Sequence, residues 1–263
     1  MSDFPQPLPM LRVPGWERVP RLVHGFCGRR GGGSEGAFAE LNVSLAVGDD
    51  PEAVRENWRR LGENLGRGVR FRKMHQRHGD GCVVVDGHGS EEPEADALIT
   101  AASGLALCVL TADCVPLLLV APERRVVAAV HAGWRGTRLG IARRAVRVIR
   151  QRFGVPPAAL HAALGPSIGA CCYQVDREIA DDIERRWGAM PETVRPDGCK
   201  RWLDLRAINR TLLTSLGIPP GQIATIGPCT RCAGDAYFSY RAVCQSEARG
   251  TTGRQVSFIG WSA

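Results

Sequence analysis

The chain has 263 residues, of which 44% are hydrophobic and 23% charged, and a formal net charge of +7. This length suffices for one large domain or two small ones, and the composition is that of a soluble globular protein. No apolar run approaches the roughly 20 residues of a membrane helix, and the first residues lack the basic and apolar regions of a signal peptide. We therefore expect a cytoplasmic protein that does not contact a membrane.

The first third of the chain predicts one strand and one helix. Residues 1–20 are rich in proline and are expected to be extended, and 22–26 should form a strand that runs into the glycine-rich loop 29–36. Asp50 is a suitable helix cap and Pro51 suits the first turn of the helix that follows. The apolar side chains of that helix recur at helical spacing: Val54, Trp58, Leu61 and Leu65.

The middle of the chain is the most apolar part and predicts a run of strands. These are expected at 82–85, 104–110, 115–121 and 125–130. The loop 132–136 then leads to Thr137, which we expect to be the N-cap of a helix. That helix places Ala142, Ala145, Val146, Ile149 and Phe153 on one face and arginines on the other.

The last third alternates short elements without a regular βαβ period. We expect strands at 161–164, 223–226, 238–240 and 256–259, and helices at 179–187 and 205–216. Strands and helices mixed in this way favour one domain of the α+β class, or one with a mixed α/β sheet.

Two tracts carry the residues with the most distinctive chemistry. Residues 111–116 (Thr-Ala-Asp-Cys-Val-Pro) contain Cys114, and 130–137 (Val-His-Ala-Gly-Trp-Arg-Gly-Thr) contain His131. Both tracts follow apolar strands at points where turn residues begin, which is where functional residues concentrate. His78, in a Gln-Arg-His-Gly sequence, is a third candidate for the same site.

The spacing of these three residues favours a catalytic metal over a structural one. Cys114 lies 36 residues after His78 and 17 residues before His131, which is not the spacing of a zinc finger. Three ligands from separate strand ends, with an open fourth position, are typical of a catalytic zinc that lowers the pKa of bound water to about 7. The alternatives are a Cys114–His131 nucleophile and base, or a buried thiol with two ordinary histidines.

Further features suggest ligand binding more weakly. Arg135 stands in a glycine-bearing turn before the helix, where backbone amides favour phosphate or carboxylate, and Arg29 stands in the loop 29–36. The arginines form no long basic block, which argues against nucleic acid. The ten cysteines should be thiols in a reducing compartment. We expect packing roles for Cys171-Cys172 and for Cys229-x-x-Cys232, with a redox or auxiliary metal role as the alternative for the second pair.

With these motifs in order, the chain resembles the laccase-domain family, once called multicopper polyphenol oxidases and now described as purine nucleoside phosphorylases or peptidoglycan editing factors. The resemblance spans nearly the whole chain. It runs through 24–26, Arg29 with 31–32, 41–42, 48–51, 56–57, 76–79, 95–100, 111–116, 131–137, 164–168, 238–241 and 253–254.

The resemblance implies an α+β fold in a single domain, with mixed sheets flanked by helices, similar to the cytotoxic-necrotizing-factor-like deamidases. It implies that His78, Cys114 and His131 bind zinc, with copper as the alternative ion. Asp113 and Arg135 are then candidate catalytic residues. Candidates for binding substrate or phosphate are Arg29, Asn42 and Arg241.

The implied activity is phosphorolysis of adenosine, inosine, guanosine and methylthioadenosine, with adenosine deamination in addition. The partners would be a nucleoside and phosphate, with no nucleic acid, and we expect a monomer. The alternative is an amide hydrolase that acts on a UDP-muramyl amino acid precursor of peptidoglycan, assisted by metal or by Cys114. Copper-dependent phenol oxidation is disfavoured, because one thiolate site lacks the several copper ligands that oxygen reduction needs. The interpretation as a nucleic-acid-binding protein is supported by the net positive charge alone.

Overall fold

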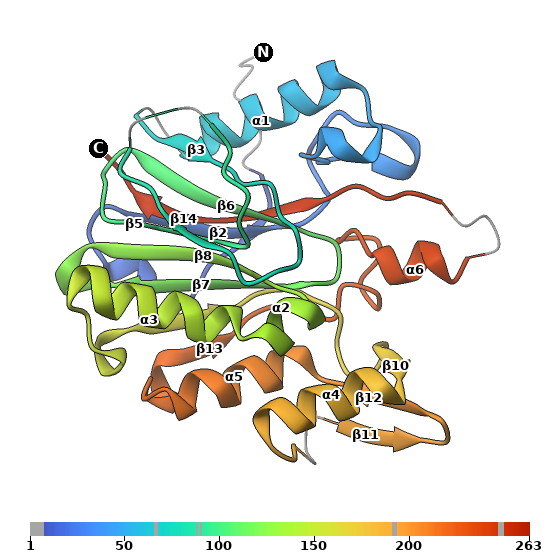
Figure 1. Cartoon of the computed structure of the whole chain (residues 1–263). Helices are drawn as coiled ribbons and strands as arrows, with labels where there is room; N and C mark the ends of the chain where they lie inside the picture. The colour runs from blue at the N-terminus through green and yellow to red at the C-terminus, as the bar shows by residue number, and fades with distance from the viewer. Residues whose placement is uncertain (1–7, 66–67, 88, 90, 191–193, 247–249) are drawn as a thin grey trace.

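Two β-sheets lie face to face in the middle of the molecule, and helices cover both outer faces (Figure 1). The computed structural model describes residues 8–65, 68–87, 89, 91–190, 194–246 and 250–263. Within the described residues, no helix is long and apolar enough to cross a membrane.

The first sheet has five strands in the order β1-β2-β14-β6-β3. Its strands are β1 (Met10–Leu11), β2 (Leu22–Cys27), β3 (Arg70–Arg72), β6 (Leu105–Thr111) and β14 (Gln255–Trp261). Only β3 pairs in parallel with its neighbour, β6. Helix α1 (Pro51–Leu65) packs on the outer face of this sheet, where Leu61 and Phe258 belong to one apolar cluster.

The second sheet has six strands in the order β13-β9-β7-β8-β5-β4. Its strands are β4 (Cys82–Val84), β5 (Ala97–Thr100), β7 (Val115–Ala121), β8 (Val126–Ala132), β9 (His161–Leu164) and β13 (Ile223–Thr225). The pairs β4–β5 and β9–β13 are parallel and the others antiparallel. The sheet is therefore mixed.

Burial on both faces explains why β7 is apolar throughout and why β8 is apolar up to His131. Successive side chains of a strand point to opposite faces of the sheet. Leu118 of β7 accordingly packs between the two sheets, whereas Leu117 and Leu119 pack under the helices. An unbroken apolar run is the pattern expected of a strand covered on both faces.

The outer face of the six-stranded sheet is covered by helices, most closely by α3 (Figure 1). The bounds of the remaining helices are α2 (Trp134–Leu139), α3 (Ile141–Phe153), α4 (Arg177–Trp187), α5 (Leu205–Ser215) and α6 (Tyr240–Cys244). A small third sheet, with the order β10-β12-β11, lies beside α4. Its strands are β10 (Gln174–Asp176), β11 (Val194–Asp197) and β12 (Lys200–Leu203).

The structure confirms the expected mixture of β-sheets and flanking helices, and it corrects two local predictions. Thr137 is not the N-cap of a helix: α2 already begins after Gly133, and Gly140, with a φ of +89°, separates it from α3. Residues 238–240 form no strand, because the hydroxyl of Ser239 accepts a hydrogen bond from Ala242 N–H and caps α6. Of the expected extended segment 1–20, residues 1–7 lie outside the described part, and the rest contains β1 and a 3₁₀ turn at Trp16–Arg18.

Candidate active site

The sheet register brings the predicted ligands to one edge of the six-stranded sheet. Strands β7, β8, β5 and β4 are consecutive neighbours, and β8 runs opposite to the other three. The C-terminal end of β8 therefore shares an edge with the N-terminal ends of β7, β5 and β4. His131 lies at that end of β8, Cys114 directly precedes β7, and His78 lies in the loop before β4.

The three side chains meet at this edge and form a group that could hold a metal ion. Their potential ligand atoms all lie within 4.8 Å of one another. The rings of His78 and His131 are 4.7 Å apart between centroids and nearly perpendicular. His131 is buried, Cys114 is half-buried and His78 is exposed, so the group is open on one side only.

Asp96, immediately before β5, holds the two histidines in place. Its Oδ1 lies 2.8 Å from Nδ1 of His131 and accepts the backbone N–H of His78 at 2.9 Å. Its Oδ2 accepts the backbone N–H groups of Gly79 and Arg77 at 2.7 and 3.2 Å. Because the carboxylate accepts a hydrogen bond from Nδ1–H of His131, Nε2 is the nitrogen of that ring that can bind a ligand, as in many histidine metal sites.

The electrostatics of the group favour a thiolate. Burial alone would raise the pKa of Cys114, but the charge of His131 and hydrogen bonds from both histidines lower it to about 6. Burial alone would lower the pKa of His131, but the Cys114 thiolate and the Asp96 carboxylate raise it to about 9. Without a metal, both shifts favour a thiolate beside an imidazolium.

A glycine is required where β8 turns into α2. A Cβ atom on Gly133 would lie 2.8 Å from Sγ of Cys114 and 3.3 Å from Cδ2 of His78. Both distances are shorter than ordinary van der Waals contact. The absence of a side chain at Gly133 therefore lets the turn pass directly over the ligand atoms.

Asp113 connects the cluster to a neighbouring wall of the site. Its backbone has a φ of +96°, and its carboxylate accepts hydrogen bonds from the hydroxyl of Thr230 at 2.6 Å and from the backbone N–H of Arg241 at 2.6 Å. The guanidinium of Arg241 lies 5.0 Å from the ring centroid of Tyr173 and donates to the carbonyl of Gln174. Asp113 thereby fixes the start of α6 beside the Cys/His group.

Three arginines interact electrostatically with Cys114 or with Tyr173, which itself senses the charge of Cys114. Arg135 on α2 is exposed. Burial and the Cys114 thiolate raise the pKa of Tyr173, and the charges of Arg241 and Arg135 oppose this rise by a smaller amount. Burial lowers the pKa of Arg254, and the Cys114 thiolate opposes that effect. The cluster is thus bordered by positive charge, which would attract an anionic ligand.

Arg29 and Asn42 are placed differently from these residues. The guanidinium of Arg29 donates to the carbonyls of Ala39 and Gly234 and lies over the ring of Phe238, so its described contacts stabilise loops. Asn42 is fully buried, and its Oδ1 accepts the backbone N–H of Arg254 at 2.9 Å. Asn42 therefore reaches the site through Arg254.

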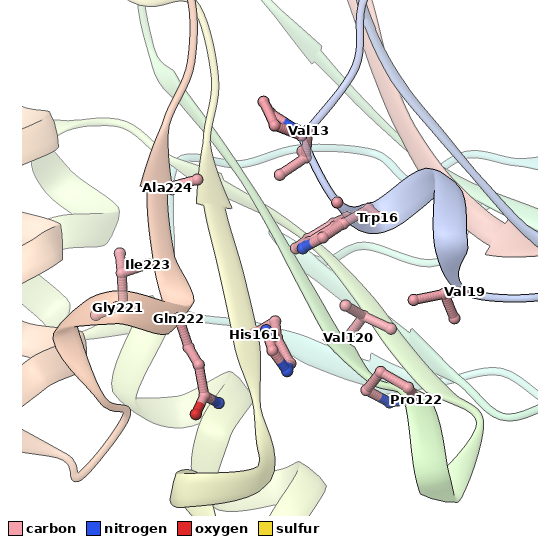
Figure 2. Close-up of a pocket in the computed structure, with 12 residues that line it drawn as sticks. Val13, Trp16, Val19, Val120, Pro122, His161, Gly221, Gln222, Ile223 and Ala224 are labelled. Carbon is pink, nitrogen blue, oxygen red and sulfur yellow. The ribbon is translucent and has the colours of Figure 1, made fainter.

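A pocket of about 270 Å³ lies at the opposite end of the six-stranded sheet, and it contains none of these residues. Trp16, His161 and Gln222 lie around it (Figure 2). Its wall includes Val120, which pairs with His161 near the far end of β7 from Cys114. The chemistry at the other edge, rather than this hollow, identifies the candidate active site.

The sequence analysis missed three residues of the site. Asp96, Tyr173 and Arg254 lie in or near motifs but were not assigned roles. One signal was available for Asp96, which is only 1% exposed: a lone carboxylate that opens an apolar run must find partners when buried. No comparable local signal distinguishes Tyr173 or Arg254, because their proximity to Cys114 arises from tertiary packing.

The donor set fits a soft or borderline divalent metal. One thiolate and two imidazoles suit zinc or copper, and three protein ligands leave a position for a water or substrate. The carboxylate behind His131 is the support that such ligands ordinarily have. The geometry thus agrees with the predicted metal site without identifying the metal.

Comparison with known proteins finds similarity to one protein family over nearly the whole chain. Residues 23–262 match the family described as multi-copper polyphenol oxidoreductase laccase. Purine nucleoside phosphorylase YlmD of Geobacillus stearothermophilus is 37% identical over 257 residues, covering 90% of this chain and 89% of that protein. A purine nucleoside phosphorylase of Deinococcus radiodurans is 38% identical over 256 residues, covering 96% and 93%. The crystal structure of hypothetical protein YfiH of Bacillus licheniformis superposes with a TM-score of 0.87 at 33% identity, covering 99% and 98%.

Proposed function

Since this chain belongs to the multi-copper polyphenol oxidoreductase laccase family, we propose that it is a zinc-dependent purine nucleoside phosphorylase. The relatives named as purine nucleoside phosphorylases support this reaction. The observation that carries the proposal is the placement of an open Cys/His group beside Arg135, Arg241 and Arg254. The substrates would be adenosine, inosine, guanosine or methylthioadenosine.

His78, Cys114 and His131 would hold the ion, and Asp96 would orient His131. When bound, zinc supplies a Lewis acid and lowers the pKa of a coordinated water. Copper is the alternative ion, because imidazole and thiolate ligands also suit it. The ion would take the place of the proton between His131 and Cys114. Its positive charge would balance that of the Cys114 thiolate.

The arginines would bind the second substrate. In phosphorolysis an oxygen of phosphate forms a bond to C1′ of the ribose, the bond from C1′ to the purine nitrogen breaks, and the purine takes up a proton. Guanidinium groups bind phosphate by charge-assisted hydrogen bonds, and Arg135 and Arg241 have the position and charge for this role. Arg29 is a further candidate for this role, because its guanidinium has five N–H donors and its bonds to the carbonyls of Ala39 and Gly234 use only part of them.

Asp113 and Tyr173 would have roles other than phosphate binding. Both oxygens of Asp113 already accept hydrogen bonds, so we assign it to positioning Arg241 rather than to a catalytic step. Burial raises the pKa of Tyr173, and the negative charge of Cys114 raises it further. Its phenol therefore keeps its proton at neutral pH and can donate a hydrogen bond to a bound substrate.

The test is incubation with adenosine, with and without phosphate, followed by analysis of the products. Adenine and ribose 1-phosphate, formed only with phosphate, are the expected products. Inosine formed without phosphate would show the deaminase activity that we also propose, since zinc deaminases use Cys/His sites with an open position. If neither product forms, or if His131→Ala leaves both zinc content and turnover unchanged, the proposal is wrong.

A second candidate is an amide hydrolase that uses Cys114 as a nucleophile on a muramyl peptide precursor. It is favoured by the chain of contacts from the Cys114 thiolate to His131 and on to Asp96, which is the order of a nucleophile, a base and an orienting carboxylate. This candidate predicts full activity after exhaustive metal chelation and loss of activity on alkylation. The zinc phosphorylase predicts loss in both treatments.

A further inference from the structure

Four cysteines that are distant in sequence meet on one side of the candidate active site. The Sγ atoms of Cys171, Cys172, Cys229 and Cys232 all lie within 4.8 Å of one another. Cys232 Sγ is 3.4 Å from that of Cys172 and 3.6 Å from that of Cys171. From the sequence, packing was expected of both pairs, with a redox or auxiliary metal role as the alternative for Cys229-x-x-Cys232, and their convergence was not predicted.

Parallel strand pairing brings the two pairs together. β9 and β13 are parallel neighbours, and Thr225 of β13 aligns with Leu164 of β9. Beyond the strand ends the chains stay in contact: Ser167 forms a parallel bridge with Cys229, and Thr230 N–H donates to the carbonyl of Ser167 at 3.1 Å. Both cysteine pairs therefore follow strands that end at the same edge of the sheet.

The distances match a single metal ion better than a disulfide. Zinc binds thiolates at about 2.3 Å, so tetrahedral ligands lie about 3.8 Å apart. The sulfurs of a disulfide are about 2.0 Å apart, which is much shorter than either distance here. An iron–sulfur cluster attaches its thiolates to different iron atoms, which requires wider spacing than a single ion.

The surroundings suit a negatively charged thiolate group. The backbone N–H of Gly169 donates to Sγ of Cys229 at 3.2 Å, and the N–H groups of Arg231 and Cys232 bond to the same atom. The guanidinium of Arg231 donates to Sγ of Cys172 at 3.5 Å. Four thiolates around one divalent ion carry a net charge of −2, which these donors would partly offset.

We propose that Cys171, Cys172, Cys229 and Cys232 bind a structural zinc ion, separate from the one at His78, Cys114 and His131. Each thiol loses a proton and donates an electron pair to the ion, and no oxidant or reductant is needed. Four protein ligands close the site, which is the arrangement of a structural zinc.

The ion would hold the segment with Cys171 and Cys172 against the segment with Cys229 and Cys232. Both segments border the candidate active site. Tyr173 follows Cys172 and faces Arg241, while Thr230 follows Cys229 and donates its hydroxyl proton to Asp113. β13 is an edge strand, and β9 is its one neighbour among the described strands of this sheet. The structural zinc would thus stabilise the position of Asp113 and Tyr173 without contacting substrate.

The test counts metal in variants of each site. The full-length protein, purified with a thiol reductant and without chelator, should contain two zinc ions per chain by elemental analysis and native mass spectrometry. Cys229→Ser should contain one, and Cys199→Ser, which changes an exposed cysteine outside the cluster, should keep two. The melting temperature should fall in Cys229→Ser and stay unchanged in Cys199→Ser.

His131→Ala separates this proposal from the proposed function and does not depend on the folding of the cysteine variant. It should keep one zinc, and X-ray absorption should show that ion with four sulfur neighbours at about 2.3 Å. Equal zinc content in Cys229→Ser and the wild type would overturn the proposal. The proposal would also be overturned if His131→Ala lacked a zinc ion with four sulfur neighbours, or if the intact mass showed disulfides among the four cysteines. If His131→Ala keeps two ions, the proposed function fails while the four-cysteine site stands.

Discussion

Asp96 is the residue on which the geometry of the candidate site depends most. Its carboxylate binds the ring of His131 and the backbone of His78, so it controls two of the three proposed ligands. It is 1% exposed, and three backbone N–H groups would lose an acceptor if the carboxylate were removed. The ligands and their support are therefore one unit.

Asp96→Asn should weaken zinc binding at the Cys/His site by about 10- to 100-fold, because loss of the supporting carboxylate typically has this effect. The amide would also turn donor hydrogens toward N–H groups that need an acceptor. Zinc affinity should be measured by competition with a chromophoric chelator. Asp181→Asn, which removes only an exposed ion pair with Arg177, is the control. Unchanged affinity in a folded Asp96→Asn protein would contradict the assignment.

The thiolate of Cys114 makes a second prediction, which applies to protein depleted of metal. Its pKa is lowered to about 6, so the thiolate predominates above that pH and is lost as the pH falls through it. The alkylation rate should therefore be level above about pH 6 and fall about tenfold per unit below. Mass spectrometry of the peptide that contains Cys114 isolates this rate from those of the other cysteines.

His131→Ala removes the main charge that lowers the pKa of Cys114. The thiolate should then form at higher pH, nearer its ordinary value of 9, and alkylation at pH 7 should slow by tens of fold. A pH profile that is the same in both proteins would show that the imidazolium does not stabilise the thiolate.

At the scale of elements, the close approach of the β8–α2 turn to β7 makes the site possible. Antiparallel pairing aligns Val115 with Ala132, so the residues just beyond, Cys114 and Gly133, lie side by side. The turn begins α2 with Gly133 as its N-cap, which places Arg135 on the first turn of the helix. One segment thus supplies a ligand, a close contact and a cation.

Gly133→Ala should reduce zinc content without unfolding the protein. The added Cβ would lie 2.8 Å from Sγ of Cys114, and relief requires the thiolate or the turn to move. We expect zinc affinity at this site to fall by at least about tenfold, as for other disturbances of ligand position. Gly221→Ala, where a Cβ meets nothing within 4 Å, is the matched control. Equal zinc affinity in both variants would show that the turn can move to accommodate the Cβ atom without weakening zinc binding.

The strength of local patterns explains which elements the sequence could predict. The long apolar strands β7 and β8 and the amphipathic helix α3 lie where expected, because burial imposes a clear pattern on them. β5, which positions Asp96, has four residues and was not predicted as a strand. The strand expected at 238–240 was wrong, because the capping hydroxyl of Ser239 outweighed the aromatic residues beside it.

At the scale of the whole molecule, the order of strands decides which residues meet. Cys114 and His131 could be proposed from residue type and turn context, since each stands at a strand end, and His78, which lies in the loop before β4, from its residue type. Their convergence, and that of the four cysteines, depends on the order β13-β9-β7-β8-β5-β4. Strand order arises from long-range packing of two apolar faces, and no local pattern in the sequence encodes it. The pairing of Cys171-Cys172 with Cys229 and Cys232 was therefore beyond the reach of the sequence analysis.

The charge of the whole molecule makes the last prediction. The chain carries a net charge of +7, and arginines border the site, so an anionic substrate should be attracted over a distance that salt screens. Raising potassium chloride from about 0.1 M to about 1 M shortens the screening length from about 10 Å to about 3 Å. The KM for phosphate should rise about 3- to 10-fold, whereas the KM for an uncharged nucleoside should change less than about twofold. Arg135→Ala should flatten the salt dependence for phosphate, and Arg150→Ala, on the exposed face of α3, should not. If both KM values rise in parallel, the effect of salt lies elsewhere, and the arginines do not form the phosphate site.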